Sequence, residues 1–485
     1  MNISIVRYLL GQILKIEAIL LLIPCIVAII YREKAGFCFV IAAGISALIG
    51  ICLSSKKPKN NVFYLKEGCL TTASSWILLS LIGCLPFYIS GEIPSFTNAL
   101  FETVSGFTTT GASILTDIES LSKCLLFWRS FTHWIGGMGV LVFLLAIAPM
   151  TGGSHMNLMK AESTGPSVGK LVPKVRSTAR ILYLLYLAMT IIHFILLIIG
   201  KVPIFDSICI SFGTAGTGGY SIKNDSFVSY SPYCTWVTAI FMMLFGINFN
   251  FFYLIILGKI KKALQMEEVR VYITIILIST LITCLTIAGN YSSFGEGLMH
   301  AFFQVTSIIT TSGFASTDYD NWIELPKIVL LFLMLIGGCA GSTAGGIKIS
   351  RLIILIKSVM KELLSYVHPK SIKKIQLDHR PIEHEVIRST NVYLIIFILL
   401  FSVSLFLLSF ENKDFSTIFS ATAANLNNVC PGFSMVGPTF SFDHFSVFSK
   451  YVMMFSMLAG RLELFPMLLI FSPVLWKECF SGRKA

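Results

Sequence analysis

One short phrase recurs four times along the sequence, and it constrains the fold more than any other feature. Each copy is an apolar run that ends in small hydroxyl residues and a glycine. The copies read SGFTTTGAS at 105–113, GTAGTGGYS at 213–221, SIITTSGFAS at 307–316 and, more loosely, NLNNVCPGFS at 425–434; aligning them pairs Gly111, Gly218, Gly313 and Gly432. The copies lie roughly a hundred residues apart, too far for a solenoid with about 20–50 residues per repeat. This spacing suits a module of two membrane helices with a re-entrant loop between them.

Composition places the chain in a membrane. Of its 485 residues, 55% are hydrophobic and only 13% are charged, with a mean hydropathy of +0.79. A soluble protein would carry about 25% charged residues. Several apolar runs reach the roughly 20 residues that a helix needs to cross the hydrocarbon core, and the alternating ten-residue segments of a membrane barrel are absent. We expect an all-α polytopic membrane protein.

The net charge of +12 reflects topology rather than nucleic-acid binding. Most Lys and Arg residues fall in four segments, 54–67, 160–180, 259–270 and 348–388, whereas the loops with the repeated glycines carry few cations. Cytoplasmic loops of membrane proteins carry an excess of Lys and Arg. We therefore expect the basic loops and both termini to be cytoplasmic and the glycine loops to lie outside. The first apolar run has no cleavage site and predicts a retained helix.

The chain lacks the residue sets of a membrane-embedded enzyme. The expected spans contain no paired carboxylates, histidine cluster or nucleophile with a nearby base. The 12 cysteines lie mostly inside apolar runs and form no CxxC pair, which indicates small buried side chains rather than disulfides or a zinc site. We expect no enzymatic activity.

The phrase divides the chain into a hairpin and four repeats. Each repeat is expected to hold a spanning helix, a short apolar segment, the glycine loop and a second spanning helix, giving ten spans and four re-entrant segments. The hairpin covers 1–55, the repeats cover 68–150, 178–258, 268–357 and 386–478, and the short segments are 94–107, 203–216, 294–309 and 414–427. Half-length segments at membrane depth need protein or a water-filled cavity around them. A pseudo-fourfold arrangement would bring the four loops to one ion pore.

The repeated phrase has the composition of a cation filter. A filter replaces the water shell of an ion with backbone carbonyls, and glycine permits the necessary backbone conformation. Neighbouring Thr and Ser hydroxyls add oxygens and bracing hydrogen bonds, and the C-terminal end of each short helix contributes partial negative charge. The acidic residues Glu102, Asp117, Asp318 and Asp320 would raise the cation concentration at the mouth.

Several longer motifs resemble one family. They are FETVSGFTTTGAS (101–113), RSFTHWIGGMGVLV (129–142), FGINFNFFY (245–253), GGCAGSTAGGIKISR (337–351), ANLNNVCPGF (424–433) and MLAGRLELFP (457–466). Together they resemble the Trk/Ktr/HKT superfamily of potassium transporters, and the N-terminal hairpin resembles its bacterial TrkH/TrkG branch. The resemblance implies K⁺ as the transported ion, with no organic cofactor in this chain. It also implies a homodimer in the lipid of the bacterial cytoplasmic (inner) membrane and a cytoplasmic TrkA-type regulatory ring that binds NAD or ATP.

The resemblance also implies roles for individual positions. The filter residues would be Thr109, Thr110, Gly111, Thr217, Gly218, Thr311, Ser312, Gly313, Asn428, Val429, Cys430 and Gly432. The intramembrane gate would comprise Gly337, Gly338, Gly341, Ser342, Thr343, Gly345, Gly346 and Arg461. In the family, a glycine in all four repeats goes with potassium preference. This chain departs from the pattern at Cys430, where glycine is frequent, and at His133, where glutamine is frequent.

Alternative interpretations stay open for several features. Arg461 is either a positive barrier in the path or forms a structural ion pair with Glu463 or another acid. Lys348 and Arg351 are either cytoplasmic anchors or contacts for a regulator, and 358–386 is a solvated loop or a docking surface. The glycine run at 337–348 lacks the GxxxxGK[ST] spacing of a phosphate loop, and His379 and His384 have no Cys partner for a metal site. As a whole function, a sodium-coupled carrier of another solute is the alternative.

Overall fold

The all-helical membrane fold expected from composition is confirmed. The computed structural model describes residues 1–58, 64–137, 139, 175–369, 374–378 and 380–473, and these form helices with one two-stranded hairpin. Within these ranges, six helices are long and apolar enough to span a membrane, or seven if one bent pair counts as a span. The expected ten spans are not all continuous helices, because three of the second helices in the repeats are broken. Part of the remaining one, 140–150, lies outside the described residues.

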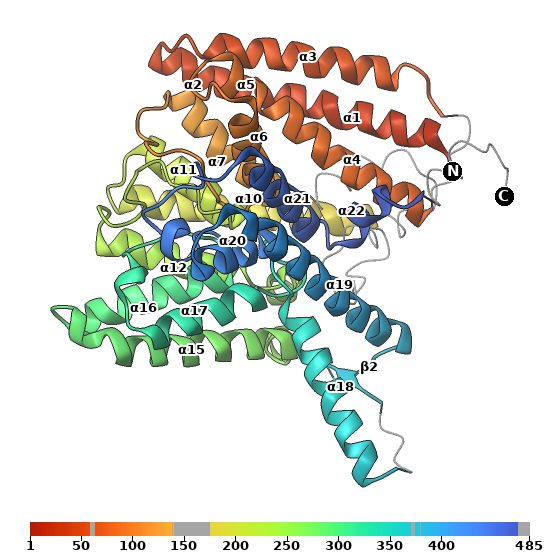
Figure 1. Cartoon of the computed structure of the whole chain (residues 1–485), viewed down its shortest axis with the longest axis vertical. Coiled ribbons are helices and arrows are strands. Elements are labelled where there is room, and N and C mark those ends of the chain that lie inside the picture. Colours follow the sequence, from red (N-terminus) through yellow and green to blue (C-terminus); the bar gives the residue numbers. More distant parts are fainter. Residues whose placement is uncertain (59–63, 138, 140–174, 370–373, 379, 474–485) are drawn as a thin grey trace.

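The N-terminal hairpin packs along one edge of the molecule (Figure 1). One arm consists of the consecutive helices α1 (Ile3–Leu21) and α2 (Ile23–Tyr31), and the other arm is α3 (Gly36–Ser54). Gly11 lets the two arms approach closely, since a β-carbon there would stand 2.7 Å from the backbone nitrogen of Ser54. Small residues at such crossings are how membrane helices pack without a hydrophobic driving force.

In each of the first two repeats, a long helix precedes a short helix and further helices follow it. Repeat 1 contains α4 (Leu65–Gly83), α5 (Leu85–Ile89), the short α6 (Phe96–Phe107) and α7 (Lys123–Gly137); repeat 2 contains α10 (Val175–Ile199), the short α11 (Ile204–Gly216), α12 (Pro232–Phe245), α13 (Phe249–Ile256) and α14 (Ile260–Leu264). The second spanning helix expected in repeat 2 is not one straight helix, because α12 and α13 meet at 92°. Asn248 sits at this corner and caps α13 by accepting a hydrogen bond from the Asn250 N–H (3.0 Å).

The last two repeats also contain broken second helices. Repeat 3 contains α15 (Glu267–Ile287), the short α16 (Phe294–Ile309), α17 (Glu324–Ile336) and α18 (Ile349–Val367); repeat 4 contains α19 (His384–Leu408), the short α20 (Phe415–Asn427), α21 (Val447–Arg461) and α22 (Phe465–Ile470). Residues 337–348 form an irregular loop, as the glycine run predicts. The second spanning helix expected in repeat 4 is not one continuous helix, because Glu463 and Leu464 take φ of 60° and 65° and separate α21 from α22.

Helix α18 leaves the body of the molecule and projects from it (Figure 1). It is followed by the antiparallel hairpin of β1 (Gln376–Leu377) and β2 (Arg380–Pro381), in which Gln376 pairs with Pro381. Side chains of α18 such as Val359, Leu363 and Tyr366 are exposed. This arm is the part of the described chain most separated from the packed core.

Candidate functional site

The four short helices end with the same backbone geometry. Each is followed by a residue in the left-handed conformation, and the next N–H donates to the carbonyl five residues earlier. The left-handed residues are Thr109, Thr217, Thr311 and Asn428, with φ of 56°, 54°, 56° and 55°. The returning bonds run from Thr110 to Ser105 (2.9 Å), Gly218 to Gly213 (2.9 Å), Ser312 to Ser307 (2.8 Å) and Val429 to Ala424 (2.9 Å). This motif satisfies carbonyls that a helix end leaves without partners, and it defines a common structural register.

The register corrects the glycine alignment in two repeats. Two positions after each left-handed residue stand Gly111, Gly219, Gly313 and Cys430. Gly218 is therefore equivalent to Thr110, one position earlier, and Gly432 lies two positions beyond the equivalent site. The sequence alignment paired glycines by identity, whereas the backbone aligns the helix ends. At the three glycines of this register φ is 76° to 81°, a conformation that favours glycine.

The four loops meet one another in a closed ring. A β-carbon on Gly111 would overlap the carbonyl oxygen of Gly218, and one on Gly219 would overlap that of Ser312. Likewise, a β-carbon on Gly313 would overlap the carbonyl oxygen of Cys430. The ring closes between the first and fourth loops, because a β-carbon on Gly111 would stand 3.8 Å from the Cys430 β-carbon. Each loop thus touches the next around one axis, and glycine is needed because a backbone carbonyl fills the space.

Polar side chains hold the helix ends in place. The hydroxyls of Thr108 and Thr110 lie 2.8 Å apart, and those of Thr310 and Ser312 repeat this contact at 2.8 Å. The amide of Asn428 donates to the Thr110 hydroxyl (2.9 Å) and so joins the fourth loop to the first. The Thr109 hydroxyl and the side-chain amide oxygen (Oδ1) of Asn428 are buried and have no protein hydrogen-bond partner among the described residues. Such oxygens, with the loop carbonyls, have the chemistry of cation ligands.

His133, to which the sequence assigned no role, joins two repeats. Its Nδ1 lies 2.8 Å from the Gly106 carbonyl oxygen in α6, and its Nε2 accepts from the Tyr220 N–H (3.2 Å) in the loop of repeat 2. The hydroxyl of Tyr220 donates back to the Glu102 carbonyl oxygen (2.7 Å). These bonds fix the first two loops relative to each other. The signal available in the sequence was a histidine one turn before a glycine-rich helix end.

Glu102 corrects another expectation. It is 1% exposed and accepts from Arg129 Nε (2.7 Å), so it does not face an open mouth. Arg129 also donates to the Ser221 carbonyl oxygen (3.0 Å) and lies 4.0 Å from the centre of the Tyr220 ring. A buried carboxylate is retained where a cation and further hydrogen bonds compensate it. This pair thus connects repeat 1 to the glycine loop of repeat 2.

The other three acidic residues lie in surface loops. Asp117 is exposed and accepts from the Asn224 side chain (2.9 Å). Asp318 and Asp320 line a cavity of about 650 Å³; Tyr319, between them, donates to the Pro431 carbonyl oxygen (2.9 Å). Burial raises the pKa of the Asp320 carboxyl. These two acids therefore lie beside the fourth loop, where their charge would act on an approaching cation.

The interrupted loop of repeat 3 lies against the helix ends. The Gly345 N–H donates to the Thr311 hydroxyl (2.7 Å), and a β-carbon on Gly345 would overlap the Asn427 carbonyl oxygen. Arg461 donates to the carbonyl oxygens of Thr343 (2.9 Å) and Gly136 (2.8 Å), so it ties the loop to repeat 1. The loop thus contacts repeats 3 and 4 directly, and the Arg461 side chain connects it to repeat 1.

The predicted gate residues lie together: all but Arg461 are in this loop, and Arg461 donates to it. Gly337, Gly341 and Gly346 take positive φ of 72°, 69° and 78°. Gly338 packs against Ala344, where an added β-carbon would lie 2.6 Å from that side chain. The Ser342 hydroxyl donates to the Cys339 carbonyl oxygen (2.7 Å). Positive φ at three glycines explains why the helix cannot continue.

The basic residues near the loop are internal rather than surface anchors. Lys348 is 2% exposed and donates to the Ala344 carbonyl oxygen. Arg351 pairs with Glu463 and lies 3.9 Å from the centre of the Tyr393 ring. The expectation of membrane-surface anchors is therefore wrong for both, since a loop that folds back into the protein buries them. His379 lies outside the described residues.

Comparison with known proteins places the chain in a family. The profile of TrkH, described as a cation transport protein, matches residues 36–478. The chain belongs to the TrkH family of cation transport proteins. It is 34% identical over 470 residues to the Trk system potassium uptake protein TrkH of Escherichia coli K12, covering 94% of this chain and 96% of that protein. It is 31% identical to TrkG, a Trk system potassium uptake protein of the same strain, covering 98% and 99%.

A solved structure agrees with the family assignment. The crystal structure of the potassium transporter TrkH from Vibrio parahaemolyticus matches with a TM-score of 0.88 at 30% identity, covering 98% of this chain and 100% of that one. The resemblance drawn from the motifs is therefore confirmed. Family members are transporters rather than enzymes, and the chain is a multi-pass membrane protein of that kind.

Proposed function

We propose that this chain takes up potassium through one pathway formed where its four loops meet, with the loop at 337–348 as a gate beneath them. The observation that carries the proposal is the closed ring of contacts in one structural register. Its near-full-length relatives in two bacterial species are potassium uptake proteins. A path between four loops needs no paired catalytic groups, and its chemistry is the replacement of water by oxygen ligands.

The filter acts through backbone carbonyls and hydroxyls. The proposed ligands come from Thr109–Gly111, Thr217–Gly219, Thr311–Gly313 and Asn428–Cys430. Four short helices direct their C-terminal ends, with partial negative charge, toward the same place. Gly218 and Gly432 stay in the proposal as supporting positions: Gly218 packs against the His133 ring and Gly432 against Ser420. Movement of K⁺ down the membrane potential gains about 2.3 kcal/mol per charge for each 100 mV.

The gate obstructs the lower end of this path. Gly345 contacts Thr311 of the filter, and Arg461 holds the loop from the opposite side. A guanidinium at this depth repels a cation and favours the closed state. Opening requires the loop to leave these contacts.

The proposal includes a cellular setting. The chain would lie in the bacterial inner membrane as a homodimer with both termini cytoplasmic, and a TrkA-type nucleotide-binding ring would act on the gate. The Escherichia coli relatives are named as Trk system proteins, which supports the existence of further components. The concentration of Lys and Arg in one set of loops supports the orientation.

Ion flux in proteoliposomes tests the proposal. The purified chain should pass K⁺ about tenfold or more faster than Na⁺ under matched gradients, and Gly111→Ser should lower that ratio because its side chain enters the ring. Gly91→Ser is the matched control, since Gly91 has φ of 78° but no neighbour within 4 Å of an added β-carbon. Equal K⁺ and Na⁺ flux would refute the selectivity. A strict requirement for Na⁺ and a second solute would favour the coupled-carrier alternative.

A further inference from the structure

A buried carboxylate that no filter or gate role accounts for holds the gate loop at two points. Glu268, in the first turn of α15, is 5% exposed. Its Oε1 accepts from the N–H groups of Ala340 (2.6 Å) and Ser350 (3.1 Å). Its Oε2 accepts a longer bond from the Asn248 side chain (3.5 Å). Among the described residues, its hydrogen-bond partners are amides rather than cations.

The two amides belong to different elements. Ala340 is within the irregular segment, whereas Ser350 is in the first turn of α18, where N–H groups have no partner within the helix. One oxygen therefore joins the loop to the start of the projecting helix, and its negative charge suits a helix N-terminus. Asn248 adds the corner between α12 and α13, where the Phe249 N–H donates to the Gly341 carbonyl oxygen (3.1 Å).

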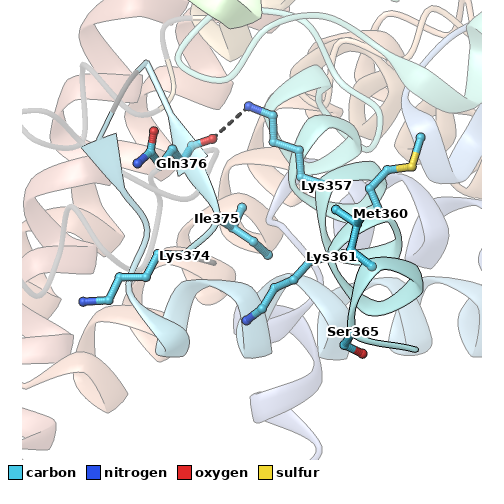
Figure 2. A pocket seen from close by; sticks show the side chains of 8 residues that line it. Lys357, Met360, Lys361, Ser365, Lys374, Ile375 and Gln376 are labelled. Carbon is cyan, nitrogen blue, oxygen red and sulfur yellow. Dashed lines mark hydrogen bonds between the residues drawn. The ribbon is translucent and has the colours of Figure 1, made fainter. Parts of the chain in front are cut away.

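The neighbouring residue, Glu267, faces the projecting arm. Its carboxylate accepts from Lys357 of α18 (2.7 Å), and its N–H donates to Asp378 (2.7 Å) in the turn of the β1–β2 hairpin. Lys357 also donates to the Gln376 carbonyl oxygen (2.8 Å), which Figure 2 shows as a dashed line. The same groove contains Lys361 and Lys374. Two consecutive carboxylates thus connect the gate loop to the arm.

We propose that Glu268 is a positioning residue that latches the gate loop closed, and that Glu267 links this latch to α18 and the β1–β2 hairpin. This inference rests on the proposed gate and names the contacts that must break for it to open. A displacement of the hairpin pulls Lys357 and Asp378, and through the first turn of α15 it moves the carboxylate away from Ala340 and Ser350. Movement of the arm is therefore the cause, and opening of the gate loop is the result.

Basal K⁺ flux and amide exchange in proteoliposomes test the latch. Glu268→Ala should raise flux through the chain alone about tenfold or more, because two bonds to a charged acceptor are lost. Glu268→Gln should fall between the wild type and Glu268→Ala, since its amide oxygen still accepts. Hydrogen–deuterium exchange at Ala340 and Ser350 should accelerate in the same order. Glu17→Gln is the control, since it changes another buried carboxylate in the N-terminal helix α1. It should leave K⁺ flux and the exchange of these two amides unchanged.

Two comparisons separate the latch from the gate. Deleting 339–346 should raise K⁺ flux. If the deletion raises flux but Glu268→Ala and Glu268→Gln leave both flux and amide exchange at the wild-type level, the latch is refuted and the gate stands. If the deletion leaves flux unchanged, both fail. On the arm, Lys357→Gln should accelerate exchange at Ser350 more than Lys361→Gln, since only Lys357 bonds to Glu267. Equal effects of these two lysine variants would overturn the link to the hairpin.

Discussion

The first three loops and the fourth reach the same ring by different means. In the first three, the position two residues after the left-handed helix end is a glycine with positive φ, and a carbonyl of the next loop fills the place of its side chain. In the fourth, Cys430 occupies this position without positive φ, and Asn428 replaces threonine at the helix end. The fourth loop is therefore held by a side-chain amide, whereas the others depend on glycine. The ring tolerates a side chain at only one of its four positions.

The largest expected effect is at a glycine of the ring. Gly313→Ala should lower K⁺ flux by about a hundredfold, because its β-carbon would overlap the Cys430 carbonyl oxygen at a backbone conformation that also disfavours alanine. Flux of ⁸⁶Rb⁺ into proteoliposomes measures the loss. Gly258→Ala, with φ of 70° and open space around it, is the control and should conduct normally. Normal flux through Gly313→Ala would show that the first three loops are no more constrained than the fourth.

A smaller effect is expected at the fourth position. Cys430→Gly should keep K⁺ flux within about threefold of the wild type and change the K⁺/Na⁺ ratio, because it removes the side chain of the fourth ring position without disturbing a backbone carbonyl. The flux ratio under matched gradients measures the change. A loss as severe as that of Gly313→Ala would contradict the asymmetry between the loops.

The amide of Asn428 is expected to matter for stability. Asn428→Ala removes its bonds to the Thr110 hydroxyl and to the Met457 carbonyl oxygen (2.9 Å each) and should cost about 1–3 kcal/mol. The thermal unfolding midpoint in detergent measures this. At the equivalent position in repeat 2, the one partner of the Thr217 hydroxyl among the described residues is the Gly216 carbonyl oxygen of its own helix end (2.7 Å), so Thr217→Ala should cost less. An equal cost would show that the amide does not hold the fourth loop specially.

The smallest expected effect concerns the start of the fourth short helix. Asp414 caps α20 by accepting from the Thr417 hydroxyl (2.6 Å) and N–H (2.9 Å), whereas Ser95 caps α6. The bond from the Thr417 hydroxyl holds the pKa of Asp414 below its ordinary value. A lowered folded-state pKa means that this stabilisation is present above the ordinary aspartate pKa of about 4 and is lost as pH falls through the lower folded value.

Asp414→Ser tests the capping difference. It should make the fourth helix start resemble the first, reducing the loss of thermal stability as the pH falls below about 4 while costing less than about 1 kcal/mol at neutral pH. Unfolding midpoints across this pH range measure the effect. An unchanged pH dependence would assign no role to the Asp414 carboxylate.

Features that depend on local sequence patterns could be predicted from the sequence, whereas features that depend on tertiary contacts could not. Apolar run lengths predict the helices, and the glycines at 337–346 predict a break because glycine alone favours their backbone. The register at Gly219 and Cys430 escapes sequence reading, since it depends on where each short helix ends rather than on which residue is glycine. The corner at Asn248 and the break at Glu463 carry no glycine run. Glu102 and Glu268 look like solvent-facing acids until their partners, distant in the sequence, are known.

The central claim is that the four loops form one cation path. Anomalous diffraction from crystals grown with Rb⁺ tests it most directly, because Rb⁺ replaces K⁺ and its position is read without assumption about the protein. We expect an anomalous peak inside the ring of Gly111, Gly219, Gly313 and Cys430, and we expect this peak to disappear in Gly313→Ala. A peak elsewhere in the membrane region with none inside this ring would contradict it.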